Sequence, residues 1–420
     1  MKKTIAILLV VCLILGGAIG YFGQQSARTP QTPQAETVTV EGQTAAPADD
    51  GPAVDETYVD AQVDALMNGP EIPTLDLERL YAEHAPDEVI LTVDGREETW
   101  GDYFYFLASQ VDYVESYFSS MASYYGMQLG WGDVVEGEDT TYADLTAASA
   151  EDALRQFAAI EGFARENGVE LTDANREAIA GQLAADIASV CGEDGTEADF
   201  EDYLGTLYMS RAMYDRINAV NALYQEGFLQ LYGENGETLD DEAALRYLED
   251  NAYVSANHIL LMTLDAATGE PLDEAAAAEK AATAQRLADE LKAIEDPEER
   301  LVRFEELKEE YCEDTGKAAY PKGYTFTPGT MVTEFEDACA ALGDYEVSDP
   351  VQSSYGYHVI LKLPADAEAQ LFDSSGSGLT ARAAAANAEY GERLQAYLDA
   401  LTVEYVEGFE APDLLQYAED

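Results

Sequence analysis

Basic residues are scarce in this chain of 420 residues. It has 22 Lys and Arg against 83 Asp and Glu, a formal net charge of −61. A nucleic-acid partner requires a stripe of cations to neutralise its phosphates, and broad adhesion to anionic lipid also requires cations, so the composition argues against both. The acidic excess favours a strongly solvated surface that resists self-association. A second interpretation is weak, diffuse binding of cations.

Cysteine is rare as well, and its spacing excludes two kinds of site. The chain contains Cys12, Cys191, Cys312 and Cys339. Cys12 lies in an apolar leading segment, and the other three lack the paired spacing of a disulfide framework or a zinc site. The sequence also lacks a calcium loop of EF-hand spacing. We therefore predict no metal and no cofactor.

Histidine occurs three times, and two of these residues mark the stretch around which the chain is organised. His258 lies in the apolar run 254–261 and His358 in the run 355–361, both of strand character. Three helical patterns separate the runs: Leu287, Leu291 and Ile294; then Leu301, Phe304, Leu307 and Tyr311; then Met331, Phe335, Ala338 and Leu342. If the two strands share a sheet, the two imidazoles meet.

Residues 253–363 resemble a parvulin-type peptidyl-prolyl isomerase domain. Five segments match in order: Ser-Ala-Asn-His-Ile-Leu at 255–260, Tyr-Cys-Glu-Asp at 311–314, Gly-Thr-Met-Val-Thr-Glu-Phe-Glu at 329–336, Val-Ser-Asp-Pro-Val at 347–351 and Gly-Tyr-His-Val-Ile at 356–360. The flanking organisation resembles PrsA- and SurA-like foldases. The resemblance implies an α+β fold: a parvulin domain, with a small antiparallel-type sheet and surrounding helices, inserted into or following an all-α chaperone-like domain.

The resemblance also implies the site residues. The catalytic positions correspond to His258, Asp314, Ser353 and His358, and the substrate-binding positions of the proline pocket to Phe326, Met331 and Phe335. A carboxylate beside paired imidazoles would fix their tautomers. Met331 and Phe335, four residues apart, are expected on one helix face. Each residue alone would also suit an ordinary core.

One loop departs from the family pattern. Parvulins usually carry a Gly-Gly-Asp-Leu-Gly loop before the pocket, and here the corresponding stretch, 318–324, reads Ala-Ala-Tyr-Pro-Lys-Gly-Tyr. Fewer glycines change the backbone conformations that the loop can adopt. The linker 264–273 contains no Lys or Arg, so selectivity for phosphorylated Ser-Pro or Thr-Pro is not expected, because a phosphate requires a cationic clamp.

The chain begins with a segment that predicts an extracytoplasmic location. Lys2 and Lys3 precede an uncharged run, so residues 1–23 form either a cleaved signal peptide or a retained membrane anchor, with lipidation at Cys12 as a third possibility. An uncleaved anchor on the outer face of the cell membrane is the preferred interpretation. Residues 24–75, rich in Gln, Thr, Pro and Ala, form a disordered linker.

Residues 76–250 form the N-terminal part of the helical chaperone-like domain, before the parvulin domain at 251–364. Val89–Val93 predicts a strand, and a helix begins near Thr99 or Asp102 and carries aromatic residues on more than one face. Thr172 caps a helix, Phe200 to Ile217 form another, and Asp240 caps a third. Residues 365–420 form a helix and a short strand that we expect to pack back on the chaperone-like domain.

The sequence thus predicts an extracytoplasmic, membrane-tethered foldase that isomerises Xaa-Pro bonds without a covalent intermediate or cofactor. Its partners would be unfolded or newly secreted polypeptides, the membrane through residues 1–23, and a second copy of the chain if it forms a homodimer. The alternative is a holdase chaperone whose parvulin domain binds peptide but is inactive. A surface adhesin that reuses the fold is disfavoured, because no repeat array or wall-anchoring signal occurs in the sequence.

Overall fold

A computed structural model describes residues 72–265, 268–372 and 378–419 of the chain. The chain divides into two compact units. The first runs to Gly227 and resumes at Leu394, and the second is Phe228–Arg393. The predicted anchor at 1–23, and the predicted linker as far as residue 71, lie outside the described residues. Among the residues described, no helix combines the length and apolar character that a bilayer crossing requires.

The first unit is mostly helical. Its helices are α3 (Leu77–Tyr81), α4 (Trp100–Tyr125), α5 (Tyr142–Glu166), α6 (Asp173–Cys191), α7 (Glu197–Thr206) and most of α8 (Arg211–Tyr232), with the 3-10 turn η2 (Leu414–Tyr417) near the end of the chain. The hydroxyl of Thr99 accepts the backbone N–H of Asp102, and Thr172 forms a capping box with Asn175, so α4 and α6 begin where the sequence predicts.

The helix predicted from Phe200 to Ile217 is wrong, because two helices occupy this stretch. Helix α7 ends at Thr206, and Tyr208 adopts a left-handed conformation with φ of 56°. Ser210 then accepts the backbone N–H of Met213 at 3.0 Å, which starts α8. The break lets Met209 and Met213 both enter the core of this unit. Their burial overrides the helical periodicity that runs through the junction.

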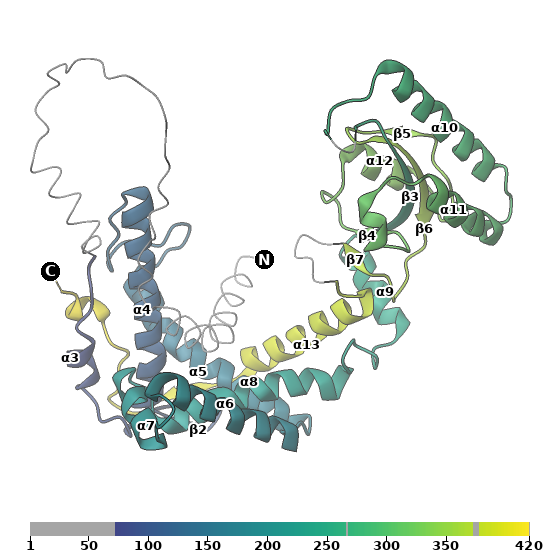
Figure 1. Ribbon diagram of the computed structural model, residues 1–420. Coiled ribbons are helices and arrows are strands. Elements are labelled where there is room, and N and C mark those ends of the chain that lie inside the picture. Colours follow the sequence, from purple (N-terminus) through teal and green to yellow (C-terminus); the bar gives the residue numbers. More distant parts are fainter. Residues whose placement is uncertain (1–71, 266–267, 373–377, 420) are drawn as a thin grey trace, which may run out of the picture. The chain divides into compact units, whose positions relative to one another are not determined.

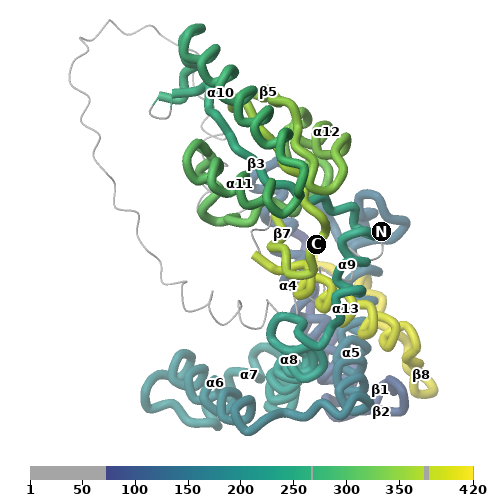
Figure 2. Tube along the Cα trace, turned by 90° about the vertical axis from the view of Figure 1, so that its right-hand side faces the viewer, coloured from purple at the N-terminus to yellow at the C-terminus, as the bar shows by residue number. Residues whose placement is uncertain are grey.

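A small antiparallel sheet joins the two ends of the first unit. Strands β1 (Val89–Val93) and β2 (Arg96–Thr99) form a hairpin through Asp94 and Gly95, whose φ values are both positive. Strand β2 is not among the elements predicted from the sequence. Strand β8 (Val403–Tyr405) pairs with the other edge of β1, with Thr92 opposite Glu404, and Figure 2 shows the C-terminal strand beside this hairpin. The end of the chain therefore completes a sheet that begins near residue 89.

The second unit contains a five-stranded sheet in the order β5-β6-β3-β4-β7. All neighbouring strands are antiparallel except β4 and β7, which are parallel. The elements are α9 (Asp241–Asp250), β3 (Val254–Met262), α10 (Glu274–Lys292), α11 (Pro297–Tyr311), the 3-10 turn η1 (Thr315–Ala318), β4 (Tyr324–Phe326), α12 (Thr333–Ala341), β5 (Val351–Gln352), β6 (Gly356–Leu363), β7 (Leu371–Phe372) and α13 (Ala381–Ala400), whose last turns belong to the first unit. This mixture of helices and sheet confirms the predicted α+β class.

The two faces of this sheet bury different sets of residues. Ile259 and Leu261 of β3 pack with Val359 and Leu361 of β6 against α10 and α11. On the opposite face, Ala256 and Ile360 pack with Phe335 of α12. Figure 1 shows α12 on one side of β3 and β6 and α10 and α11 on the other. Because side chains alternate along a strand, His258 next to Ile259 and His358 next to Val359 face the opposite way, toward α12.

The third predicted helix is shorter than its periodicity indicated. Helix α12 covers Thr333–Ala341, so Met331 lies before the N-cap residue Val332, and Leu342 is the C-cap. The expectation that Met331 and Phe335 share one helix face is therefore wrong. Met331 instead packs against the cluster that contains Phe335 from the preceding turn, where its backbone N–H donates to Glu336 at 2.8 Å.

Candidate functional site

Two buried imidazoles meet on the α12 face of the sheet. In the antiparallel pairing of β3 with β6, His258 lies opposite Ile360 and Leu260 opposite His358, so the histidines are diagonal neighbours on one face. Their Nδ1 atoms are 3.0 Å apart, and the rings stack with their planes 18° apart. The prediction that the strands bring the imidazoles together is confirmed.

Asp314 lies at the outer end of this pair. It caps η1, the turn after α11, and its Oδ1 accepts the backbone N–H of Gly316 at 2.9 Å. Its Oδ2 is 3.0 Å from Nε2 of His258. Burial favours the neutral acid, but hydrogen bonds from His258, from Tyr324 and from the Gly316 backbone outweigh burial and hold the pKa of Asp314 below its usual value. Asp314 is therefore a carboxylate at neutral pH.

The hydrogen bonds through this site run in one direction when both imidazoles are neutral. A carboxylate accepts only, so Nε2 of His258 carries the proton and its Nδ1 is an acceptor. Nδ1–H of His358 then donates to His258, which leaves Nε2 of His358 to accept from the hydroxyl of Ser353 at 2.7 Å. Ser353 Oγ in turn accepts the backbone N–H of Tyr355 at 3.1 Å. All four proposed catalytic side chains belong to this line.

His358 is held neutral by its surroundings. Its ring is 4% exposed. Burial and the neighbouring His258 lower the pKa of His358 to about 3, against the opposing effect of Asp314. The inner imidazole therefore acts as a hydrogen-bonding group over the whole physiological range, not as a cation.

The three expected pocket residues lie beside the imidazoles. The ring of Phe335 approaches His258 edge-on, with centroids 5.3 Å apart, and lies 5.6 Å from the ring of His358. Phe326 of β4 contacts Phe335 at 5.8 Å and is fully buried, whereas Met331 is partly exposed. The three side chains thus form one apolar cluster against the imidazole pair.

Two groups near the site were missed by the sequence analysis. The hydroxyl of Tyr324 donates to Asp314 Oδ2 at 2.6 Å, and the thiol of Cys312 accepts the backbone N–H of Leu260 at 3.4 Å. Cys312 lies in the segment 311–314 that resembles the family, and Tyr324 in the loop that departs from it. The loop 318–324 differs from the family pattern in its missing glycines, and the same difference introduces the Tyr324 side chain.

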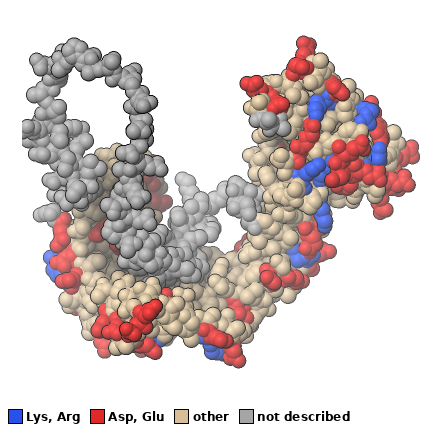
Figure 3. Space-filling view, viewed as in Figure 1, with Lys and Arg blue, Asp and Glu red and all other residues tan. Residues whose placement is uncertain are grey.

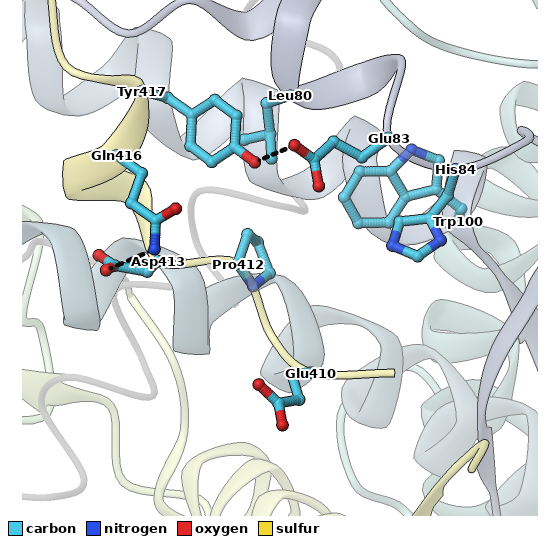
Figure 4. Close-up of a pocket in the computed structure, with 9 residues that line it drawn as sticks. All are labelled: Leu80, Glu83, His84, Trp100, Glu410, Pro412, Asp413, Gln416 and Tyr417. Carbon is cyan, nitrogen blue, oxygen red and sulfur yellow. Dashed lines mark hydrogen bonds between the residues drawn. The ribbon is translucent and has the colours of Figure 1, made fainter. Parts of the chain in front are cut away.

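The first unit contains a separate small cavity of about 160 Å³. Figure 4 shows Trp100 beside His84 at one end of the cavity, and Tyr417 directed at Glu83. The Tyr417 hydroxyl donates to Glu83 at 2.5 Å, and the Gln416 amide donates to Asp413 at 3.1 Å. Four of the polar lining groups are thus paired with one another.

A family model and several known proteins match parts of this chain. A family model described as rotamase, the PPIC-type PPIASE domain, matches residues 258–363, which confirms the parvulin resemblance. Foldase protein PrsA of Oceanobacillus iheyensis is 28% identical over 221 residues, which cover 52% of this chain and 61% of that protein. Foldase protein PrsA 1 of Bacillus cereus is 54% identical over 59 residues, or 14% of this chain and 20% of that protein. The matches thus span less than two thirds of either relative.

Among solved structures, the crystal structure of PrsA from Bacillus subtilis is 20% identical. The match covers 64% of this chain and 93% of that chain, with a TM-score of 0.23.

Proposed function

We propose, from the PPIC-type parvulin domain that residues 258–363 form, that the chain is a foldase that catalyses cis/trans isomerisation of Xaa-Pro peptide bonds. The observation that carries the proposal is the hydrogen-bonded line Asp314–His258–His358–Ser353 beside the ring of Phe335. The line supplies polar groups of fixed orientation, and the aromatic ring supplies an apolar wall. A prolyl amide needs both.

The chemistry requires neither a nucleophile nor a cofactor. Rotation about a prolyl bond faces a barrier of about 18–20 kcal/mol, although cis and trans differ by only about 0.5–1 kcal/mol. A catalyst must bind the twisted amide more tightly than either planar form. As resonance is lost, the amide nitrogen becomes pyramidal and more basic, so a water-poor site with prearranged hydrogen bonds lowers the barrier.

Each site residue has a proposed part in this reaction. Met331 and Phe335 contact the pyrrolidine ring, and Phe326 supports Phe335 from below. Asp314 and the two imidazoles form the polar floor under the twisted amide, and Ser353 holds the tautomer of His358. Because Asp314 is ionised and His358 neutral, the floor keeps one arrangement of donors and acceptors throughout the catalytic cycle.

A protease-coupled isomerisation assay tests the activity. A soluble form that begins at residue 72 is compared with Asp314→Ala on unphosphorylated Xaa-Pro peptides. We expect Asp314→Ala to lower kcat/KM by about tenfold or more, since about 1.4 kcal/mol of transition-state stabilisation corresponds to tenfold in rate. The matched control is Asp337→Ala, which removes an exposed carboxylate from α12. A folded protein that does not accelerate isomerisation contradicts the proposal.

The proposed clients are unfolded or newly secreted polypeptides that contain Xaa-Pro bonds, met outside the cytoplasm. This location rests on residues 1–23, which read as a signal or a membrane anchor, with the linker after them as a tether. Fractionation of cells that produce the full chain, with protease added from outside, tests it. Protein that is degraded at the cell surface and stays with membranes supports the tether. Protein protected inside the cell contradicts it.

Exposed aromatic residues favour a second candidate, a holdase whose parvulin domain binds peptide without catalysis. Tyr124 and Tyr125 at the end of α4 are 84% and 72% exposed, and Met127 and Val134 nearby are exposed as well. Apolar surface of this kind suits contact with unfolded chains. The holdase proposal predicts suppression of client aggregation that persists in Asp314→Ala and is lost in Tyr124→Ser/Tyr125→Ser. If the chain is an isomerase, peptide isomerisation is instead lost in Asp314→Ala and persists in Tyr124→Ser/Tyr125→Ser.

A further inference from the structure

Tyr324 is delivered into the site by the loop that departs from the family pattern. Gly323 before it has φ of +102°, and a Cβ on Gly323 would lie 2.6 Å from the carbonyl oxygen of Ala256, so the loop passes against β3. Lys308 of α11, a buried side chain, donates to the carbonyl oxygen of Pro321 at 2.7 Å and anchors the loop on its other side. The loop therefore positions Tyr324 through the backbone itself, despite its fewer glycines.

The hydroxyl of Tyr324 and the ring of His258 donate to the same oxygen of the Asp314 carboxylate. Asp314 Oδ2 accepts from Tyr324 at 2.6 Å and from Nε2 of His258 at 3.0 Å, while Oδ1 accepts from Gly316. Three donors from three directions fix the plane of the carboxylate. Tyr324 is 8% exposed, so its hydroxyl bonds inward and does not present itself to a substrate.

Other aromatic rings hold Tyr324 in this position. The ring of Tyr320 lies 5.0 Å away, and Phe372 contacts Tyr324 edge-on at 5.3 Å. Phe372 belongs to β7, which pairs in parallel with β4 and lies beyond the matched parvulin residues. The rotation of the tyrosine ring away from Asp314 is therefore opposed by a strand outside the family domain.

We propose that Tyr324 is a positioning residue of this site: its hydroxyl orients the Asp314 carboxylate and, through His258, sets the direction of the hydrogen bonds that reach Ser353. The inference rests on the proposed isomerase function for its catalytic consequence. Its structural part, the hold of Tyr324 on Asp314, does not depend on catalysis. The hydroxyl stabilises the ionised acid, so its removal makes Asp314 easier to protonate.

The test is Tyr324→Phe in the full chain, with Tyr320→Phe as the matched control that removes a hydroxyl from the neighbouring ring. The carboxyl-carbon resonance of Asp314, assigned with Asp314→Asn, is followed by NMR as the pH falls. We expect the midpoint of its titration to rise by about one pH unit in Tyr324→Phe, the effect of one hydrogen bond to a carboxylate, and to stay unchanged in Tyr320→Phe. Equal midpoints in Tyr324→Phe and the wild type overturn the inference.

The pH profile of isomerisation gives the second measurement. In Tyr324→Phe the fall of kcat/KM in acid should begin at a higher pH than in the wild type, because the Asp314 carboxylate that catalysis uses is easier to protonate. A wild type without isomerase activity, but with a shifted Asp314 midpoint in Tyr324→Phe, defeats the proposed function and leaves this inference standing. Normal wild-type activity, with the same Asp314 midpoint and the same acid limb in Tyr324→Phe, supports the proposed function and overturns this inference.

A second variant covers the case in which Tyr324→Phe does not fold. Phe372→Leu keeps the tyrosine hydroxyl but removes the ring that opposes its rotation. We expect a rise of the Asp314 midpoint in the same direction and smaller than in Tyr324→Phe. A folded Phe372→Leu protein in which Tyr324 and Asp314 behave as in the wild type counts against the proposed hold.

Discussion

Burial decides the protonation of His358, and with it the stability of the protein in weak acid. The pKa of His358 is lowered to about 3 by burial and by His258, whereas an exposed imidazole in the unfolded chain has a pKa of about 6.5. Between these two values the unfolded chain takes up a proton that the folded protein excludes. The free energy of unfolding therefore falls as the pH drops below about 6.5 and is unaffected by this ring above it.

We predict that His358→Gln removes this dependence. Between pH 7.5 and 5 the wild type should lose about 2 kcal/mol of unfolding free energy through His358 alone, and the variant should lose that much less. Urea unfolding at a series of pH values measures both slopes. The comparison uses slopes and not absolute stabilities, so a less stable variant still tests it. Parallel pH dependences in the two proteins contradict the prediction.

Asp314 and Tyr324 show how one residue can be predicted and its neighbour missed. Asp314 was found because it ends a short segment of family type, Tyr-Cys-Glu-Asp. Tyr324 lies ten residues later in a loop without that pattern, and its hydroxyl reaches Asp314 because β4 pairs with β3. A hydrogen bond between a turn and a strand that tertiary pairing brings together has no characteristic spacing in the sequence.

At the level of elements, a buried ion-pair cluster joins β2, α5 and α8 in the first unit. Arg216 of α8 donates two hydrogen bonds to Glu98 of β2, at 2.6 and 2.9 Å, and two to Glu161 of α5, at 3.2 and 3.0 Å. Glu98 is fully buried, and burial raises its pKa even beside Arg216 and Arg96. Without Arg216, the buried carboxylate of Glu98 would lose its bidentate partner.

We predict that Arg216→Met destabilises the protein by about 3–5 kcal/mol, the cost of breaking a buried ion pair from one side. Arg211→Met is the matched control: Arg211 begins the same helix and pairs with Glu197 and Asp215, but these partners are exposed. It should cost about 1 kcal/mol or less. Urea unfolding compares the two variants, and equal costs would show that burial of the cluster is energetically unimportant.

Helices were predicted better than strands and junctions. The helix starts at Thr99, Thr172 and Asp240 follow from side chains that cap the backbone within three residues, which is local information. The break at Tyr208 and the strands β2 and β4 depend on burial and on pairing with distant residues. Their sequences carry no comparable local signal.

At the level of the whole molecule, the net charge of −61 sets the balance between attraction and repulsion. Figure 3 shows Asp and Glu over the viewed face of both units, with fewer Lys and Arg among them. Like charges at this density repel one another in the compact state and are screened by salt within a Debye length of about 10 Å at 0.1 M. The folded chain therefore gains stability as ionic strength rises.

We predict that the thermal midpoint rises between low salt and 0.5 M sodium chloride, by about 2–4 °C for each kcal/mol of repulsion that is screened. Calcium chloride at matched ionic strength should give a similar rise if screening is the cause. Differential scanning calorimetry measures both series. A midpoint that does not respond to sodium chloride contradicts the repulsion argument, and a much larger rise with calcium indicates bound cations in place of screening.

The predicted domain boundaries differ from the division of the chain by its contacts. The sequence predicts boundaries at 250/251 and 364/365, whereas contacts divide the chain inside α8 and α13. Both divisions keep β3 to β6 together, but the predicted boundary at 364/365 separates β7 from the sheet whose edge it forms. Whether residues 251–364 fold as an independent domain stays a prediction.

The order of residues was enough to establish the α+β class, the helix caps and the presence of a paired-imidazole site, because periodicity, capping and a family-like run of short segments are local properties of a chain. Folding was needed to establish that Oδ2 of Asp314 is shared between His258 and Tyr324, that Met331 precedes its helix, that Arg216 reaches Glu98 and that β8 pairs with β1. Each of these depends on residues far apart in the sequence that the burial of apolar surface brings together. Burial is non-directional, so it does not reveal in the sequence which residues will meet.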